Sequence, residues 1–227
     1  MIKEHTERLI SVRTNDIVLE GMLGVPHPVL GAVLFAHGSG SSRFSPRNNF
    51  VAKVLRQHHL ATLLIDLLTP GEDEIYKNRF DIELLTERLA RVAEWIETES
   101  ELGDLPLGLF GASTGAASAL RLAASMGGKI CAVVSRGGRP DLAEQFLSAV
   151  IAPTLLIVGG NDDLVLELNR LAYEKLQAPK ELTIVPGATH LFEEPGALEA
   201  VAARASEWFT KYLGAAAERP AVLQARA

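Results

Sequence analysis

The chain has 227 residues and a formal net charge of −6, which comes from 28 acidic and 22 basic residues interspersed along it. This length suits one α/β domain with a substantial core, and the mixed charge argues against a nucleic-acid surface or a polybasic membrane patch. Because there is a single cysteine, Cys131, and neither a signal-peptide pattern nor a long apolar run, we expect a cytoplasmic protein without disulfides and without a membrane partner.

Two β-rich runs open the chain, at residues 8–13 and 17–25, and a short polar turn separates them. They predict an antiparallel hairpin at the edge of a sheet. From residue 31 onward, short unbroken apolar runs alternate with amphipathic stretches. The runs lie at residues 32–36, 61–68, 105–110, 130–134, 154–158 and 181–185. Unbroken apolar strands indicate burial on both faces, as in a parallel sheet covered by helices.

The stretches between these runs have helical patterns. At residues 81–98 and 197–213 apolar residues recur at spacings of three and four, which gives each helix one apolar stripe. Further helices are expected near residues 46–58, 116–126 and 164–177. We therefore predict an α/β fold with an eight-stranded, mostly parallel sheet, an N-terminal antiparallel hairpin and helices on both faces. It forms a single domain over residues 1–214, and a frayed tail follows at 215–227.

The third parallel strand runs into the pentapeptide Gly111-Ala112-Ser113-Thr114-Gly115, which small helix formers follow. Strand, sharp turn and helix would place Ser113 at the apex of the turn, at the carboxyl end of the sheet. The two glycines remove side chains that would collide in so tight a turn. One interpretation is an ordinary turn of small residues, and the other is a nucleophile on a strained elbow.

The loop after the first parallel strand reads His37-Gly38-Ser39-Gly40-Ser41-Ser42-Arg43. A phosphate-binding loop is one interpretation, but the third glycine of the dinucleotide fingerprint is absent and no Walker lysine follows. We favour an oxyanion loop, in which the backbone N–H groups of Ser39 and Thr114 bind a substrate carbonyl oxygen. His37 is a candidate base, although a ring that packs and orients the loop is the interpretation we prefer.

Acidic residues and a histidine follow the last two strands. Asp162 and Asp163 come after residues 154–158, where a carboxylate can orient an imidazole or cap the following helix. His190 comes after residues 181–185, and an imidazole there can take a proton from Ser113 and return it to a leaving group. The order Ser113, Asp162, His190 is the order of the triad in α/β-hydrolases.

With these motifs the chain resembles the α/β-hydrolase fold, and within it the dienelactone-hydrolase-like family, whose small members lack a large lid. The resemblance covers about residues 17–213 and rests on the His-Gly-Ser-Gly loop, Gly-Ala-Ser-Thr-Gly, Gly-Gly-Asn-Asp-Asp-Leu-Val and Gly-Ala-Thr-His-Leu-Phe. It implies that Ser113, Asp162 and His190 are catalytic, with Asp162 orienting the histidine and Asp163 capping the helix. No metal or organic cofactor is implied.

One departure bears on the substrate. Dienelactone hydrolase proper carries cysteine at the elbow, whereas this chain has Ser113, and Cys131 lies in a predicted strand. A serine suits a general ester or acyl hydrolase at least as well as the dienelactone reaction. A peptidase or thioesterase with the same triad, and a non-catalytic ligand-binding relative, are the alternatives.

The segment at residues 135–152, where related hydrolases insert a lid, has room for one short helix, so we expect a minimal lid and a pocket open to a small-molecule substrate. Arginines near it are candidate ligands for a substrate carboxylate, because guanidinium and carboxylate groups form bidentate pairs. They are Arg43, Arg136 and Arg139, with Arg79 as a further case. Solvated surface arginines are the alternative for all four.

Overall fold

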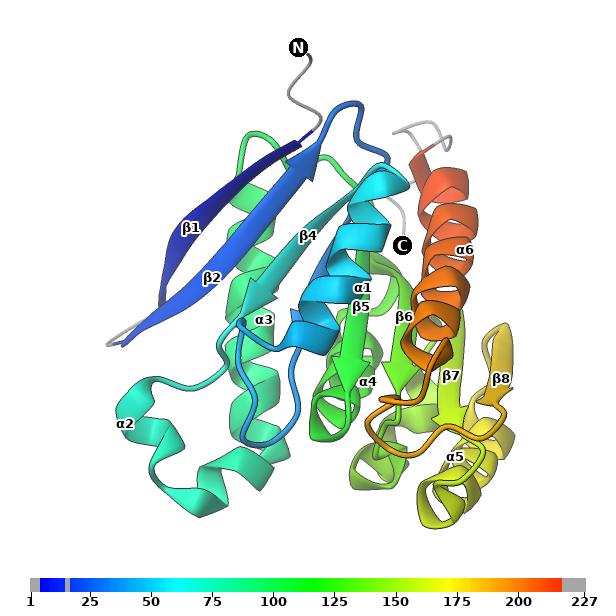
Figure 1. Cartoon of the computed structure of the whole chain (residues 1–227). Coiled ribbons are helices and arrows are strands. Elements are labelled where there is room, and N and C mark those ends of the chain that lie inside the picture. Colours follow the sequence, from blue (N-terminus) through cyan, green and yellow to red (C-terminus); the bar gives the residue numbers. More distant parts are fainter. Residues whose placement is uncertain (1–4, 15–16, 218–227) are drawn as a thin grey trace.

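The structure, a computed structural model, describes residues 5–14 and 17–217. Its sheet has eight strands in the order β1-β2-β4-β3-β5-β6-β7-β8 (Figure 1). The strands are β1 (His5–Thr14), β2 (Ile17–Pro26), β3 (Gly31–Ala36), β4 (Leu60–Ile65), β5 (Leu107–Ala112), β6 (Ile130–Arg136), β7 (Thr154–Gly159) and β8 (Lys180–Val185). β2 runs antiparallel to β1 and to β4, and the other neighbours run parallel. The predicted edge hairpin and the mostly parallel sheet are confirmed.

Helices cover both faces of the sheet. The long ones are α1 (Pro46–Gln57), α3 (Ile82–Thr98), α4 (Thr114–Met126), α5 (Asp163–Lys175) and α6 (Ala197–Ala217). α1 and α6 pack together on one face, and α3 and α4 pack together on the other (Figure 1). No helix within the described residues is both long and apolar enough to cross a membrane.

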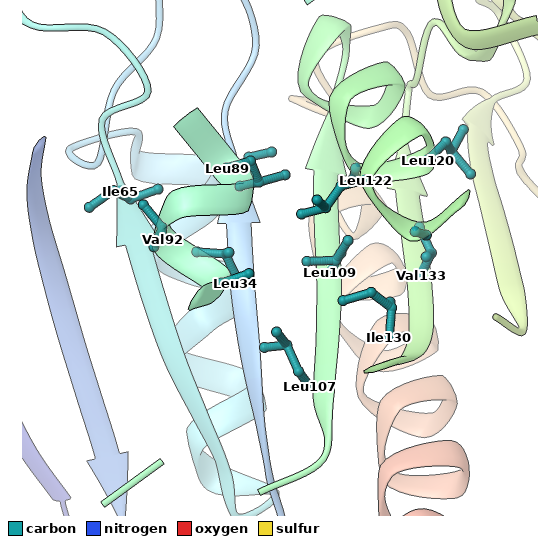
Figure 2. Packing of buried hydrophobic residues seen from close by; sticks show 14 of the residues in the cluster. Leu34, Ile65, Leu89, Val92, Leu107, Leu109, Leu120, Leu122, Ile130 and Val133 are labelled. Carbon is teal, nitrogen blue, oxygen red and sulfur yellow. The ribbon is translucent and has the colours of Figure 1, made fainter. Parts of the chain in front are cut away.

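Each central strand contributes to two apolar cores, one on each face. Leu34 of β3 and Leu109 of β5 point toward α3 and α4, where Figure 2 shows them near Leu89 and Leu122. Their chain neighbours point the other way: Phe35 and Phe110 belong to the core under α1 and α6, and their ring centroids lie 4.8 Å apart. Side chains alternate across a strand, so burial on both faces requires the unbroken apolar runs seen in the sequence.

Short helical segments lie at the carboxyl edge of the sheet. Residues 66–81, between β4 and α3, form α2 (Pro70–Asp73) and a 3-10 turn (Tyr76–Phe80), and Figure 1 shows them projecting beyond that edge. Thr69 begins α2 with a capping box, in which its hydroxyl accepts from the Glu72 N–H and the Glu72 carboxylate accepts from the Thr69 N–H. A four-residue helix is too short to show a periodic pattern, so the sequence did not predict it.

The sequence predicts a minimal lid and a C-terminal tail, and the structure describes the first segment and the start of the second. Residues 135–152 hold a short 3-10 segment, η3 (Pro140–Ala149), which is kinked at Ala143, in place of a large insertion. α6 continues to Ala217, so residues 215–217, which the sequence assigns to the tail, are helical. The rest of the predicted tail, residues 218–227, lies outside the described residues.

Candidate active site

Ser113 stands at the turn between β5 and α4 with a φ of 52° and a ψ of −122°. A non-glycine residue rarely adopts a positive φ, and it keeps such a conformation only where the surrounding structure enforces it. Here the flanking glycines show how tight the turn is. A Cβ on Gly115 would lie 2.2 Å from the carbonyl oxygen of Ala36, and one on Gly111 would lie 2.4 Å from Cα of Ala116. The Gly-x-Ser-x-Gly pattern therefore follows from packing at an elbow and is more than a chance run of small residues.

The loop after β3 lies against this elbow. A Cβ on Gly38 would be 3.0 Å from Cβ of Ser113 and 3.7 Å from its Oγ. The backbone N–H of Ser39 donates to Oγ1 of Thr114 over 2.9 Å, and Thr114 itself is buried. Thus the predicted oxyanion loop is beside Ser113, but the Ser39 amide already donates to the Thr114 hydroxyl, a contact that no pattern in the sequence indicates.

His37 is fixed through both ring nitrogens. Nε2 accepts from the backbone N–H of Leu67 over 3.1 Å, so the proton sits on Nδ1, which donates to the carbonyl of Gly38 over 2.9 Å. Burial lowers the pKa of the His37 imidazole below its ordinary value. A neutral ring with no free nitrogen serves as a support for the loop, which confirms that interpretation over a catalytic base.

His190 and Asp162 meet at the carboxyl ends of β8 and β7. Nδ1 of His190 lies 2.6 Å from Oδ2 of Asp162, a distance typical of a short, charge-assisted hydrogen bond. The Asp162 side chain is 15% exposed and the His190 side chain is 38% exposed, so the carboxylate is sheltered while the ring reaches solvent. This arrangement fixes the tautomer with its proton on Nδ1 and leaves Nε2 as the acceptor.

Asp163 does not have the role expected of it. α5 begins at Asp163, and the residue in the N-cap position is Asp162. Neither carboxylate accepts a capping hydrogen bond from the helix among the described residues, because the Asp162 side chain turns to His190 instead. The prediction that Asp163 caps the helix is therefore wrong, and its charge acts only near the positive end of the helix dipole.

His190 lies against the strand end that also supports Ser113. Gly137 follows β6 with a φ of 50°, and a Cβ there would lie 3.5 Å from Cε1 of His190. The backbone N–H of Ser113 donates to the carbonyl of Arg136, the last residue of β6, over 3.2 Å. The Ser113 hydroxyl makes no hydrogen bond to another residue in the described part of the chain, so no structural partner occupies it.

Proteins of known structure share this architecture. No protein-family model matches the chain. The crystal structure of a dienelactone hydrolase from Anabaena variabilis is similar with a TM-score of 0.90 and 54% identity, over 92% of this chain and 99% of that one. The chain belongs to the dienelactone-hydrolase-like family of α/β-hydrolases. Est1E from Butyrivibrio proteoclasticus shares the fold, with a TM-score of 0.78 at 16% identity over 90% of this chain and 98% of that one.

Curated relatives of this dienelactone-hydrolase-like chain carry a different name. Two proteins from strains of Mycobacterium tuberculosis, each named "Putative phosphoribosyl transferase", are 54% identical to it over 204 residues. The match covers 90% of this chain and 46% of those proteins, so the chain spans about half the length of the curated relatives it matches.

Two of the arginines that the sequence proposes as substrate ligands have carboxylate partners within the chain. Both the backbone N–H and the guanidinium of Arg43 donate to Asp66, and the guanidinium also lies 4.4 Å from the ring centroid of Phe44. Arg139 forms a bidentate pair with Asp141, with distances of 2.8 and 2.7 Å, and these hydrogen bonds raise the pKa of its guanidinium. Both arginines hold loops in place.

Arg79 is likewise paired, since its guanidinium donates to the carboxylate and the backbone carbonyl of Asp73. Arg136 differs from the other three, because it is only 8% exposed and its side chain forms no ion pair or hydrogen bond with any residue that the structure describes. Cys131 is a partly buried residue of β6 packed against the core under α1 and α6, as expected for a residue that is not the nucleophile. Spacing alone could not separate the four arginines, because their partners lie elsewhere in the chain.

Proposed function

We propose that the protein is a serine hydrolase that cleaves a carboxylic ester, a lactone or a related acyl bond of a small molecule. The observation that carries this proposal is the pairing of His190 with Asp162 beside the strained turn of Ser113. Asp162 holds Nδ1 of the imidazole, so Nε2 is the nitrogen left for proton transfer. A structural histidine such as His37 has both ring nitrogens hydrogen-bonded, whereas among the described residues only Nδ1 of His190 has a partner.

In the first half of the proposed reaction, Oγ of Ser113 attacks the carbonyl carbon of the substrate and its proton passes to Nε2 of His190. The imidazolium that forms is stabilised by the Asp162 carboxylate. Collapse of the tetrahedral intermediate breaks the bond to the leaving oxygen, which takes the proton from His190. An acyl-enzyme on Ser113 and a free hydroxyl group result; in a lactone the two stay in one molecule.

In the second half, a water molecule gives a proton to Nε2 of His190 while its oxygen attacks the acyl carbon. The new tetrahedral intermediate expels Oγ of Ser113, which takes the proton back, and the carboxylic acid leaves. Water is the only co-reactant, and the proposed steps use neither a metal ion nor an organic cofactor.

Two backbone amides are proposed to bind the negative oxygen in both intermediates. The Thr114 N–H lies in the first turn of α4, where the helix dipole favours negative charge. The Ser39 N–H now donates to Oγ1 of Thr114, and we propose that it shares or exchanges this acceptor for the oxyanion when substrate binds. The Thr114 hydroxyl would thereby hold the second donor close to its working position.

The names of the relatives bear on the substrate to different degrees. The Anabaena protein, which this chain matches almost end to end, is named a dienelactone hydrolase, and this supports a lactone or ester. The transferase name belongs to proteins more than twice as long as the matched part, so we assign no phosphoribosyl transfer to this chain. With serine at the elbow, simple carboxylic esters are the first substrates to test.

Turnover of activated esters tests the proposal. Wild-type protein should hydrolyse p-nitrophenyl acetate or butyrate, or an unsubstituted lactone, well above the rate in buffer, and Ser113→Ala should abolish the difference while its circular dichroism spectrum stays unchanged. Ser118→Ala, at a buried serine in the helix that follows Ser113, is the matched control and should retain activity. Equal turnover by wild type and Ser113→Ala would refute the proposal.

A further inference from the structure

Arg136 ends β6 on the face of the sheet that α1 and α6 cover. Its side chain is 8% exposed, and Nε and Nη1 are fully buried without a hydrogen-bond partner among the described residues. The ring centroid of Phe192 lies 5.9 Å from the guanidinium carbon. A buried charge is costly unless it is paired and hydrogen-bonded, so an arginine in this state lacks a counterion.

A second cation, Arg47, makes the deficit of negative charge larger. Burial, and then the charge of nearby Arg47, lower the pKa of Arg136 to about 10, at which the guanidinium is still charged at neutral pH. Arg47 lies in the first turn of α1, where the helix dipole disfavours a cation. Its Nε is also buried without a partner in the described part of the chain, although Nη1 donates to Glu193 over 3.2 Å. Two cations thus lie near each other with unmet donors.

The position of this pair relates it to the active site. The carbonyl of Arg136 accepts from the Ser113 N–H, and Gly137, the next residue, borders the ring of His190. Phe192 is two residues beyond His190 and Arg47 lies just past the loop that follows β3. Arg136 is therefore adjacent to the nucleophile through its backbone and to the base through the residue after it, and Arg47 is close in the chain to the oxyanion loop.

We propose that Arg136 and Arg47 form an oxyanion-binding subsite beside the active site, and that this subsite receives a carboxylate or phosphate group carried by the substrate. The second part rests on the proposed hydrolase function, whereas the first part does not. A guanidinium presents several N–H donors in one plane, which matches the oxygens of a carboxylate or phosphate. A bound oxyanion would supply the missing acceptors and screen the two cations from each other.

Binding is measured by isothermal titration calorimetry on Ser113→Ala, in which no turnover takes place, with sodium phosphate and sodium acetate as separate probes. At least one probe should bind saturably with one site. Adding Arg136→Met should weaken binding about ten- to hundredfold, and Arg47→Met should weaken it by a smaller factor. Arg121→Met is the matched control, because Arg121 also lies over a phenylalanine ring but is paired with Glu83, and it should leave binding unchanged.

The effect of added anions on thermal stability distinguishes an anion-binding arginine from a purely structural one. Because an uncompensated buried cation is replaced by an apolar chain, Arg136→Met should be at least as stable as the wild type in anion-free buffer. Millimolar phosphate or acetate should raise the Tm of the wild type and not that of Arg136→Met. If Arg136→Met fails to fold, the same titration on Arg47→Met tests the subsite, because the Arg47 side chain is partly exposed.

Two kinetic arms distinguish the sources of the oxyanion. The kcat/KM ratio of mono-p-nitrophenyl succinate to p-nitrophenyl butyrate reports recognition of a carboxylate. The kcat/KM ratio of a p-nitrophenyl butyrate that carries a phosphate group on its ring to p-nitrophenyl butyrate itself reports recognition of a phosphate. One of these ratios should fall about tenfold or more in Arg136→Met or Arg47→Met. The subsite is refuted if neither probe binds Ser113→Ala, or if both variants bind as the control does. Absence of ester turnover alone would count against the hydrolase function and not against the subsite.

Discussion

Asp162 and His190 are 28 residues apart in the chain, yet Oδ2 of one lies 2.6 Å from Nδ1 of the other. The pairing follows from the topology: β7 and β8 are parallel neighbours, so the loops after them emerge side by side at the carboxyl edge of the sheet. Asp163 is the next residue, but it starts α5 and does not reach the ring.

This relationship predicts unequal effects of two conservative substitutions. Asp162→Asn should lower kcat by about 10⁴-fold, because the amide cannot stabilise the imidazolium and favours the wrong tautomer of His190. Asp163→Asn changes charge by the same amount one residue away and should lower kcat by no more than about threefold. Steady-state kinetics on one activated ester measures both, and a larger loss in Asp163→Asn would show that the wrong aspartate has been assigned.

Ser113 and His190 should act as one unit. Ser113→Ala and His190→Ala should each reduce kcat by several orders of magnitude, and the double variant should lose little more than either single one, since each removal disables the same step. Rates are compared with that of the Ser118→Ala control. Losses that add in free energy would mean that the two side chains act independently.

The Thr114 hydroxyl should position the oxyanion loop. Thr114→Val keeps the shape of the side chain but removes the acceptor for the Ser39 N–H, so the glycine-rich loop loses an anchor. We expect kcat to fall about tenfold or more with little change in KM, as for a donor that acts in the transition state. Thr114→Ser restores the hydroxyl and should recover most of the rate. An unchanged or higher kcat in Thr114→Val would indicate that this bond is not an anchor.

His37 should make stability dependent on pH. Burial lowers its folded-state pKa, so the unfolded chain binds the proton more tightly. The stabilisation from the neutral ring is complete above the unfolded pKa of about 6.5 and is lost as the pH falls toward the folded pKa. This group adds at most about 1.4 kcal/mol per pH unit to the slope of the free energy of unfolding.

Urea denaturation between about pH 7 and pH 5 measures that slope. His37→Gln should show a shallower loss of stability on acidification than the wild type. At neutral pH it should also be less stable by about 1–3 kcal/mol if the buried Leu67 N–H is left without its acceptor. Parallel stability curves for the two proteins would exclude His37 as the titrating group.

Much of the site was predictable because of one rule of parallel sheets. Functional side chains gather after the carboxyl ends of strands, and the unbroken apolar runs made those ends visible in the sequence. Ser113, Asp162 and His190 could therefore be selected, and the structure brings them to one edge. The strand order itself was not predicted, but it determines that the loops bearing Asp162 and His190 are neighbours.

Side-chain pairing was beyond the reach of the sequence. Arg43 and Asp66 are 23 residues apart, and nothing in the spacing shows that they meet while Arg136 is left without a carboxylate. The capping role given to Asp163 was wrong for a similar reason, because a helix boundary is uncertain by one or two residues and a carboxylate chooses between competing donors. Local patterns show where groups lie along the chain, and tertiary contacts decide which groups pair.

Covalent labelling shows directly whether Ser113 is a nucleophile. The protein is incubated with a fluorophosphonate probe, digested and mapped by tandem mass spectrometry, with Ser113→Ala and Ser118→Ala treated in parallel. We predict one adduct on Ser113 in the wild type and in Ser118→Ala, and none in Ser113→Ala. A folded wild-type protein that stays unlabelled, or that carries the adduct on another residue, would show that Ser113 is not the nucleophile.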